Sequence, residues 1–238
     1  MYVIKMQQPN LNILVTGASR GIGASIAVQL GQSHNVILLG RDQQALQVTA
    51  SAIPSTNVSV LQCDVTSQVE IERVCAALDG VDVFVNNAGI AEFADVADMP
   101  LASAQRQITT NLLAPMAFLH TLVPMMIQRR KGMIITVNSV AATTVFRGAA
   151  AYSASKAGML AYTRSLRQET REYGVKVIDL IVGATETEIW SEESRTELGQ
   201  RMMSAQNIAD LVRELVGNFG NERMMIEEVT IRPQLGDL

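Results

Sequence analysis

Short, nearly continuous apolar runs alternate with longer segments of helical periodicity along almost the whole chain of 238 residues. The first six of these runs are apolar on both faces, as expected of strands in a parallel sheet that is covered by helices on either side. This alternation predicts an α/β fold with a doubly wound, mostly parallel, seven-stranded sheet and helices on both faces. The predicted strands are 12–18, 35–41, 58–65, 82–89, 132–140, 176–184 and 224–233.

The chain shows no division into parts. No linker rich in Pro, Gly or Ser interrupts the alternation and no internal repeat is visible, so we expect residues 1–238 to form one domain. An apolar fraction of 48 % with 18 % charged residues is typical of a globular protein. The net charge of −4 argues against broad electrostatic binding to nucleic acid.

Targeting and metal-binding signals are weak. The start of the chain has no basic region followed by an apolar one, and no uninterrupted apolar run approaches the length of a membrane span. Cys63 and Cys75 lack the CxxC spacing and stand apart from His34 and His120. We therefore expect no secretory leader, no membrane association, no disulfide and no metal site, and a cytoplasmic location.

A glycine-rich turn, "TGASRGIG" at 16–23, follows the first predicted strand and opens the first helix. Its GxxxGxG spacing differs from the GxGxxG fingerprint, and no Lys-Ser/Thr pair follows as a P-loop requires. Glycines still permit a tight turn and close approach of a pyrophosphate to the helix N-terminus, although a turn without ligand is the alternative. Ligands of such sheets bind outside the carboxyl ends of the strands, where this chain places small and polar residues: 17–23, Arg41, Asp64, 86–89, Ser139 and 183–187.

Five motifs then occur in order: the glycine turn, "NNAG" at 86–89, Asn111 within a helix, "NSV" with Ser139, and Tyr152-x-x-x-Lys156. Together they resemble the short-chain dehydrogenase/reductase family, over residues 12–233. The resemblance implies a Rossmann-type fold and an NADP-dependent oxidoreductase that interconverts a carbonyl and a secondary alcohol. A non-catalytic NADP-binding redox sensor or scaffold is the alternative, and degraded catalytic positions would be expected of it.

Tyr152 and Lys156 lie one helical turn apart, on the same face. A phenol can protonate the alkoxide left by hydride transfer when its pKa lies near the working pH, and a neighbouring ammonium favours the phenolate. We therefore expect Lys156 to lower the pKa of Tyr152. Ser139, at a strand end, can polarise the same carbonyl oxygen. The resemblance implies that Asn111 positions a water that links Lys156 to solvent; a polar residue of the core is the alternative.

The second strand ends in "LLGRD", at Gly40, Arg41 and Asp42. Arg41 and Arg20 could both pair with the 2′-phosphate of NADP(H) through charge-assisted hydrogen bonds. This predicts NADP(H) over NAD(H). An Asp42 that faces the ribose would favour NAD(H), and both arginines could also be ordinary exposed residues.

The resemblance implies further cofactor contacts. Asp64 would meet the adenine edge, although it could instead cap a helix, a role that Thr66 or Ser67 could also fill. Thr187 would contact the nicotinamide carboxamide, on a turn where Val182 replaces the usual proline and its fixed φ. The full predicted cofactor set is Gly17, Ser19, Arg20, Gly21, Ile22, Gly23, Arg41, Asp64, Val65, Asn87, Ala88, Gly89, Tyr152, Lys156, Gly183 and Thr187.

The substrate is a small-molecule carbonyl or alcohol that the sequence does not identify. By resemblance, the pocket is closed by 90–96, 141–148 and 188–206, with a largely apolar lining from Phe93, Val145, Phe146 and Trp190. Arg147 would either meet an anionic group or be solvated. The resemblance also implies a homodimer or homotetramer, packed through the helices that bear Asn111 and Tyr152.

Overall fold

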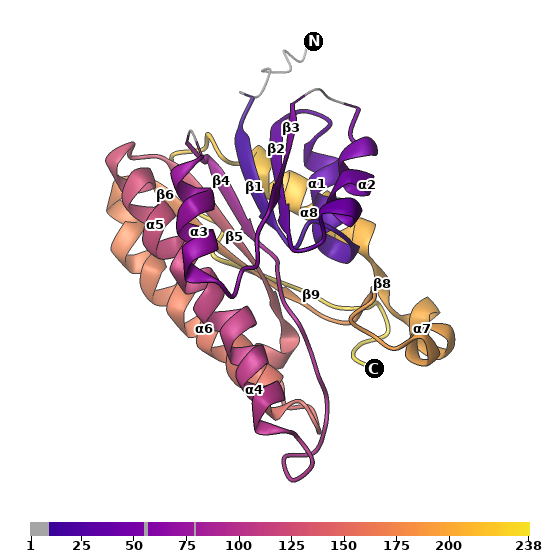
Figure 1. Cartoon of the computed structure of the whole chain (residues 1–238). Coiled ribbons are helices and arrows are strands. Elements are labelled where there is room, and N and C mark those ends of the chain that lie inside the picture. Colours follow the sequence, from indigo (N-terminus) through magenta and orange to yellow (C-terminus); the bar gives the residue numbers. More distant parts are fainter. Residues whose placement is uncertain (1–9, 55–56, 79) are drawn as a thin grey trace.

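The computed structural model describes residues 10–54, 57–78 and 80–238; the prediction drawn from the start of the chain concerns residues outside this part. Seven strands form one sheet in the order β3-β2-β1-β4-β5-β6-β9, and every neighbouring pair is parallel (Figure 1). The predicted fold class is therefore confirmed. The strands are β1 Asn12–Thr16, β2 Asn35–Gly40, β3 Val58–Gln62, β4 Val83–Asn86, β5 Gly132–Ser139, β6 Val175–Val182 and β9 Glu228–Ile231.

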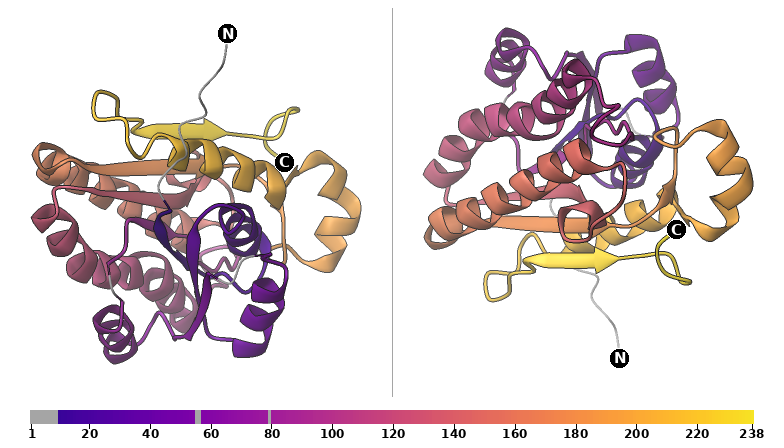
Figure 2. Two further views of the ribbon diagram at one scale, coloured as in Figure 1. Left: turned by 90° about the horizontal axis from the view of Figure 1, so that it is seen from above. Right: turned by 90° about the horizontal axis from the view of Figure 1, so that it is seen from below.

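Helices cover both faces of this sheet (Figure 2). Alternation within β1 shows why its run is continuously apolar: Ile13 and Val15 pack into one core cluster, and Leu14 packs into the other. One cluster includes side chains of α1 Gly21–Leu30, α2 Gln43–Ser51 and α8 Ala205–Gly217. The opposite one includes side chains of α3 Gln68–Ala76, α5 Ala114–Gln128 and α6 Ala150–Thr170.

The last strand is shorter than predicted, with four residues in place of the run 224–233. The chain before it is held by other bonds: Lys176 Nζ donates to the carbonyls of Asn218, Asn221 and Met224 at 2.6–3.0 Å. Carbonyls that point toward one ammonium are not aligned for a ladder, so pairing with β6 begins only at Glu228.

The helical segment Leu101–Gln128 consists of α4 Leu101–Ile108, a π-helical turn Thr109–Leu113 and α5. Pro115 lacks the N–H that would bond the carbonyl of residue 111 in a regular helix, and a wider turn accommodates its ring. By length and composition alone this segment could cross a membrane. In the fold, Phe118, Leu119 and Leu122 of its second half are instead buried in the core beside the sheet.

A second, two-stranded sheet that the sequence did not predict pairs β7 Thr185–Glu186 with β8 Met203–Ser204. Two-residue strands are too short to show an apolar pattern. The segment between them contains α7 Glu192–Leu198. Short 3₁₀ turns complete the described elements: Val140–Ala142, Arg171–Tyr173 and Gly199–Arg201.

Candidate active site

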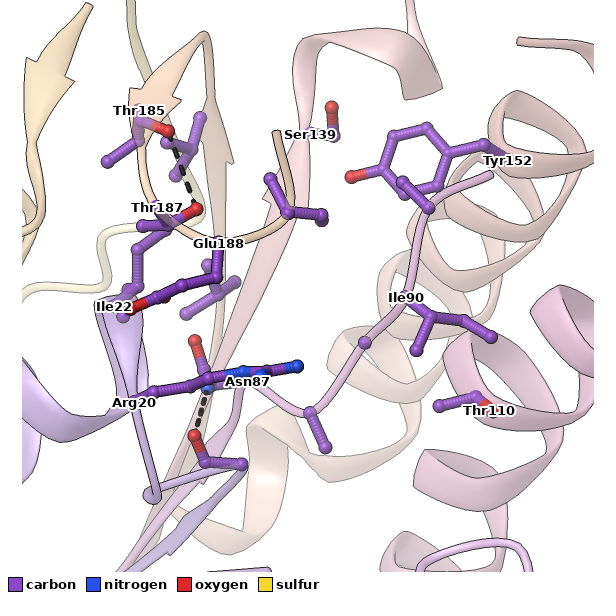
Figure 3. A pocket seen from close by; sticks show the side chains of 18 of the residues that line it. Arg20, Ile22, Asn87, Ile90, Thr110, Ser139, Tyr152, Thr185, Thr187 and Glu188 are labelled. Carbon is purple, nitrogen blue, oxygen red and sulfur yellow. Dashed lines mark hydrogen bonds between the residues drawn. The ribbon is translucent and has the colours of Figure 1, made fainter. Parts of the chain in front are cut away.

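A cavity of about 1320 Å³ opens where β1, β2, β4, β5 and β6 end, around the point where the strand order reverses between β1 and β4 (Figure 3). It brings together nearly all of the predicted site residues. Those that line it are Gly17, Ser19, Arg20, Gly21, Ile22, Arg41, Asp64, Val65, Asn87, Ala88, Gly89, Ser139, Tyr152, Lys156, Gly183 and Thr187. Gly23 and Asn111 do not line it.

The glycine turn is tied to the end of β4. Thr16 Oγ1 accepts hydrogen bonds from the backbone N–H groups of Asn87 (3.0 Å) and Ala88 (3.1 Å), and Asn87 Nδ2 donates to Thr16 O at 2.9 Å. Gly17 has a φ of +66°, and a Cβ there would lie 2.9 Å from Ala88 Cα. A Cβ on Gly23 would lie 2.3 Å from Asn87 Nδ2, so the predicted cofactor contact of Gly23 is replaced by packing behind the cavity wall.

Two cations lie at the cavity, one in the glycine turn before α1 and one directly after β2. Arg20 and Arg41 are exposed and line it, and neither has a carboxylate within 4.0 Å in the part of the chain that the structure describes. Asp42 Oδ1 accepts the N–H of Ala45 at 3.0 Å and thereby caps α2. Its carboxylate is therefore engaged by the first turn of this helix.

Asp64 at the end of β3 lines the cavity, and the alternative that it caps a helix is wrong, because Ser67 caps α3. Asp64 Oδ1 accepts the N–H and the hydroxyl of Thr66 at 2.9 and 2.8 Å. Burial opposes ionisation of this carboxyl, yet the Thr66 hydrogen bonds and the nearby Arg41 hold its pKa below the ordinary value.

Tyr152 and Lys156 meet Ser139 from α6. Lys156 Nζ donates to Val137 O at 3.1 Å and lies 5.8 Å from the centre of the Tyr152 ring. With 8 % of its surface exposed, Lys156 has a pKa that burial lowers to about 8. Burial raises the pKa of Tyr152 and outweighs the opposite effect of the neighbouring Ser139 hydroxyl. The predicted lowering of the Tyr152 pKa by Lys156 is thus wrong for the protein alone.

Asn111 lies in the π-helical turn and is 2 % exposed. Its Oδ1 accepts the N–H of Ile90 at 2.9 Å, and its Nδ2 donates to Ile90 O at 2.8 Å and to Ser155 Oγ at 3.0 Å. A Cβ on Gly89 would lie 3.3 Å from Asn111 Oδ1 and 3.7 Å from Lys156 Nζ, so both side chains flank this glycine. The Asn111 side chain joins the loop after β4 to helix α6.

The side of the cavity next to Tyr152 is aromatic. The ring of Phe93 stacks on Trp190 with centroids 6.1 Å apart and meets Tyr152 edge-on at 5.8 Å. Phe146 also lines this side, whereas Val145 is 95 % exposed and does not, contrary to prediction.

Arg147, for which two roles were open, is largely solvated and paired. Its Nε donates to Asp95 Oδ1 at 3.1 Å and its Nη2 to the other oxygen of the same carboxylate. With 88 % of the Arg147 side chain exposed, this pair lies at the rim of the cavity.

The turn after β6 is held without a proline. Val182 is buried in the ladder with β9, and Gly183 donates its N–H to Ile231 O at 2.8 Å. Thr187 therefore reaches the cavity as the resemblance implied. Ile90, Thr185 and Glu188 also line the cavity and lie in the predicted ranges 90–96, 183–187 and 188–206. Asn138 and Thr110 line it too but were not named as site residues, although the place of Asn138 at the end of β5 was a usable signal.

Groups of three or more His, Cys, Asp or Glu side chains that could hold a metal ion are not found among the described residues. Cys63 and Cys75 are buried free thiols, and burial raises the pKa of each to about 11. Neither thiol is therefore an available thiolate near neutral pH.

Comparison with known proteins agrees with this geometry. The family model described as short chain dehydrogenase matches residues 11–198. An uncharacterized oxidoreductase of Staphylococcus epidermidis is 32 % identical over 226 residues, which covers 92 % of this chain and 96 % of the relative. One of Staphylococcus haemolyticus is 29 % identical over the same shares of the two chains.

Solved structures agree as well. A variant of actinorhodin polyketide ketoreductase, crystallised with NADPH, superposes with a TM-score of 0.86 at 27 % identity, covering 96 % of this chain and 98 % of that one. A protein described as a short chain dehydrogenase/reductase family member superposes over the same shares with a TM-score of 0.84 at 25 % identity. The motif order, the parallel sheet, the cavity at the strand ends and these matches lead to one conclusion: the chain belongs to the short-chain dehydrogenase/reductase family of oxidoreductases, which bind nicotinamide cofactors.

Proposed function

We propose that this protein is an NADP-dependent oxidoreductase that interconverts a carbonyl and a secondary alcohol, with Tyr152 as the general acid and base. The main support is the convergence of Ser139, Tyr152 and Lys156 in the same cavity as the glycine turn. We further propose that residues 1–238 form one domain, so that the cofactor and the substrate share this cavity.

Each side chain has a role that follows from its position. A nicotinamide cofactor held at the glycine turn would supply or accept the hydride. The Ser139 hydroxyl donates a hydrogen bond to the substrate oxygen, and Tyr152 gives that oxygen its proton in reduction or removes it in oxidation. Lys156 is a cation below about pH 8 and stabilises the phenolate electrostatically.

Asn111 holds the Ile90 loop and α6 in register around this centre. Pro115 cannot donate to the main-chain carbonyl of Asn111, which supports the proposal that this residue binds a water leading from Lys156 to solvent. The water would return a proton to the site after each turnover.

The preference for NADP(H) rests on charge. Arg20 and Arg41 line the cavity, and no carboxylate of the described residues lies within 4.0 Å of either, while Asp42 is engaged as a helix cap. A dianionic 2′-phosphate suits two such guanidinium groups, each of which contributes about 1.5–3 kcal/mol through a charge-assisted hydrogen bond. The ketoreductase with the similar fold was crystallised with NADPH.

The substrate side favours an uncharged, largely apolar carbonyl compound. Phe93, Phe146 and Trp190 supply the lining, and the one cation in the adjoining loop, Arg147, is paired with Asp95. We propose in addition that the protein acts in the cytoplasm on a free small molecule, as a homodimer or homotetramer, with no nucleic acid or membrane partner.

The decisive experiment measures the loss of reduced-nicotinamide absorbance with NADPH or NADH. The substrate panel contains aromatic and aliphatic ketones, diketones, 3-oxo esters and 3-oxoacyl thioesters. We expect turnover with NADPH and a loss of about 10²–10⁴-fold in kcat for Tyr152→Phe. An equally active Tyr152→Phe variant would contradict the assignment of the proton donor. A protein that binds NADPH tightly but turns over nothing in the panel would favour the redox-sensor alternative.

The cofactor preference has its own test. Replacing Arg41 with Ala should raise the Kd for NADPH by about 10–100-fold and leave that for NADH nearly unchanged, since only the 2′-phosphate contact is lost. Gln43→Ala, next to the cap of α2 and also at the cavity, is the matched control. A parallel loss of affinity for both cofactors would show that Arg41 does not read the 2′-phosphate.

A further inference from the structure

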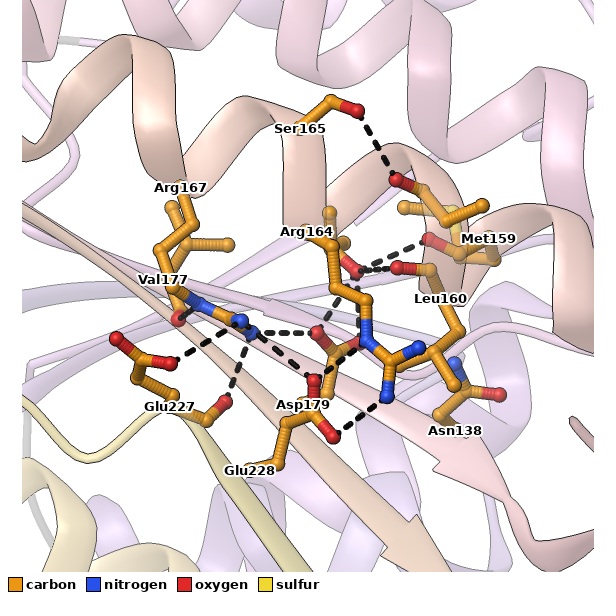
Figure 4. A network of polar contacts seen from close by, with 12 residues as sticks. Asn138, Met159, Leu160, Arg164, Ser165, Arg167, Val177, Asp179, Glu227 and Glu228 are labelled. Atoms are coloured by element: carbon orange, nitrogen blue, oxygen red, sulfur yellow. Dashed lines mark hydrogen bonds and ion pairs between the residues drawn. The ribbon is translucent and has the colours of Figure 1, made fainter. Parts of the chain in front are cut away.

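Helix α6 buries a second cation on the face that carries Lys156, about three turns farther along the helix. Arg167 is 2 % exposed, and its Nη2 donates to Asp179 Oδ2 of β6 and to Glu227 O, both at 2.9 Å (Figure 4). Its Nε donates to Val177 O at 2.8 Å. The guanidinium is thus fixed to two strands, β6 and the start of β9.

Asp179 is fully buried and accepts further hydrogen bonds. Thr163 Oγ1, also on α6, lies 2.9 and 2.7 Å from its two oxygens. The side chain of Asn138, at the end of β5, lies close enough to this carboxylate to lower its pKa against the effect of burial. Asp179 of β6 is thus joined to α6 through Thr163 and Arg167.

Asn138 connects this pair to the active site. It is 3 % exposed, its Oδ1 accepts the backbone N–H of Ser139 at 2.8 Å, and its Nδ2 donates to Lys156 O at 3.3 Å. One side chain thus hydrogen-bonds the backbones of two site residues, and it lies beside the carboxylate that holds Thr163 and Arg167 of α6.

We propose that Arg167, Asp179 and Asn138 are positioning residues that set where Ser139 and Lys156 stand relative to each other. The inference rests on the proposed function, because it concerns the same catalytic groups. None of the three is a catalytic residue in itself.

The physical reason is directionality. Apolar contacts between a helix and a sheet are non-directional and permit small shifts of the helix, whereas hydrogen bonds have narrow preferred distances and angles. A buried ion pair adds little net stability over apolar residues of similar volume, so its value lies in specifying geometry. A displacement of about 1 Å at a catalytic group can cost about a hundredfold in rate.

The outer part of the same cluster provides a matched comparison. Arg164 forms a bidentate pair with Glu228 at 2.6 and 2.8 Å, one turn from Arg167, and half of its side chain is exposed. It shares the helix and the chemistry of the buried pair. Among the described residues, the Arg164 guanidinium donates hydrogen bonds to Glu228 and none to Asp179 or Asn138.

The test removes the buried pair as a unit, so that no unpaired charge is left in the core. Arg167→Met combined with Asp179→Leu is compared with Arg164→Met alone, because Glu228 is also an ion-pair partner of Arg167, 3.6 Å from its Nη1. We expect kcat at saturating NADPH to fall about 10–100-fold in the double variant and to stay within about twofold in Arg164→Met. The Kd for NADPH and the midpoint of thermal unfolding are measured alongside, and the Kd should stay within about twofold in both.

Asn138→Leu tests the link alone, since it keeps both charges and a similar volume. It should lower kcat at saturating NADPH to the same extent as Arg167→Met combined with Asp179→Leu, with little change in the KM for the carbonyl substrate. If the three residues had a purely structural role, their replacement would lower the midpoint of thermal unfolding without changing kcat at saturating NADPH. A kcat equal to that of the parent, in either the Arg167→Met/Asp179→Leu variant or Asn138→Leu, would overturn the proposal.

Tyr152→Phe is run in the same assay to separate the two proposals. If Tyr152→Phe is inactive while Asn138→Leu and the Arg167→Met/Asp179→Leu variant keep the kcat of the parent, only the positioning role fails. If Tyr152→Phe itself remains active, the assignment of the general acid fails, whatever the other variants show.

Discussion

Two buried cations on one face of α6 have opposite surroundings. Lys156, 8 % exposed, contacts the Val137 carbonyl oxygen and the ring of Tyr152, and no carboxylate of the described residues lies within 4.0 Å of it. Arg167, 2 % exposed, contacts the Asp179 carboxylate and two carbonyls, and the carboxylates of Glu227 and Glu228 lie 3.8 and 3.6 Å from its Nη1. The same helix thus holds one cation without charge compensation and one that is fully compensated.

The difference shows how burial can serve two purposes. Without a counter-charge, burial lowers the pKa of Lys156 to about 8, so its charge can change near physiological pH. Arg167 stays protonated near physiological pH. Its pairing with Asp179 offsets the cost of burying the charge, and the hydrogen bonds of the pair fix the position of both side chains. Burial raises the pKa of Asp179 to about 6 despite its partners, so the carboxylate is ionised at neutral pH.

The largest expected effect is on catalysis. Replacing Lys156 with Met removes the charge that stabilises the phenolate, and kcat should fall about 10³-fold. Because an uncompensated buried charge also disappears, the free energy of unfolding at pH 7 should rise by about 1 kcal/mol, the lost bond to Val137 offsetting part of the gain. Steady-state kinetics and urea unfolding measure both; a marked loss of stability would contradict the view that Lys156 is uncompensated.

Replacing Arg167 with Met reverses the sign of the stability change. It leaves Asp179 buried without its counter-charge, so the free energy of unfolding should fall by about 3–5 kcal/mol in urea. Arg164→Met, on the half-exposed pair, is the control and should cost less than about 1 kcal/mol. Equal losses in the two variants would remove the distinction between the buried and the outer pair.

The smallest effect is a dependence of stability on pH. The folded-state pKa of Lys156 lies at about 8, below the ordinary 10.5, so between these values the unfolded chain binds more protons than the folded protein. The free energy of unfolding should therefore rise from pH 8 to pH 10, by about 2 kcal/mol relative to Lys156→Met. Parallel curves for the parent and the variant over this range would show that Lys156 keeps an ordinary pKa.

The cofactor side of the site was predictable because each of its signals is local in the sequence. A glycine turn directly after an apolar strand, small and polar residues at strand ends, and a Tyr–Lys pair one helical turn apart can all be recognised within a few residues. The parallel sheet places these strand ends along one edge, so the cavity follows from the topology.

The buried cluster behind the site was not predicted, for equally physical reasons. Asp179 interrupts an apolar run and Arg167 lies in "SLRQET", which has the composition of a solvated helix face. Glu227, whose carbonyl accepts a hydrogen bond from Arg167, lies 60 residues farther along the chain, and no pattern of neighbouring residues predicts a contact over that separation. The π-helical turn was missed as well, since its cause, Pro115, occurs in a segment that otherwise reads as a regular helix.

The short β7–β8 ladder also has an evolutionary consequence. It holds the two ends of 187–202 side by side, so that this segment leaves and re-enters the fold at nearly one place. Insertions, deletions or exchanges within 189–202 would leave the seven-stranded sheet in place and would keep Thr187 and Glu188 beside Gly21 of the glycine turn. Because 189–202 also supplies Trp190 to the cavity, a lineage could change the apolar lining of the cavity by replacing this one segment while Ser139, Tyr152 and Lys156 are inherited intact.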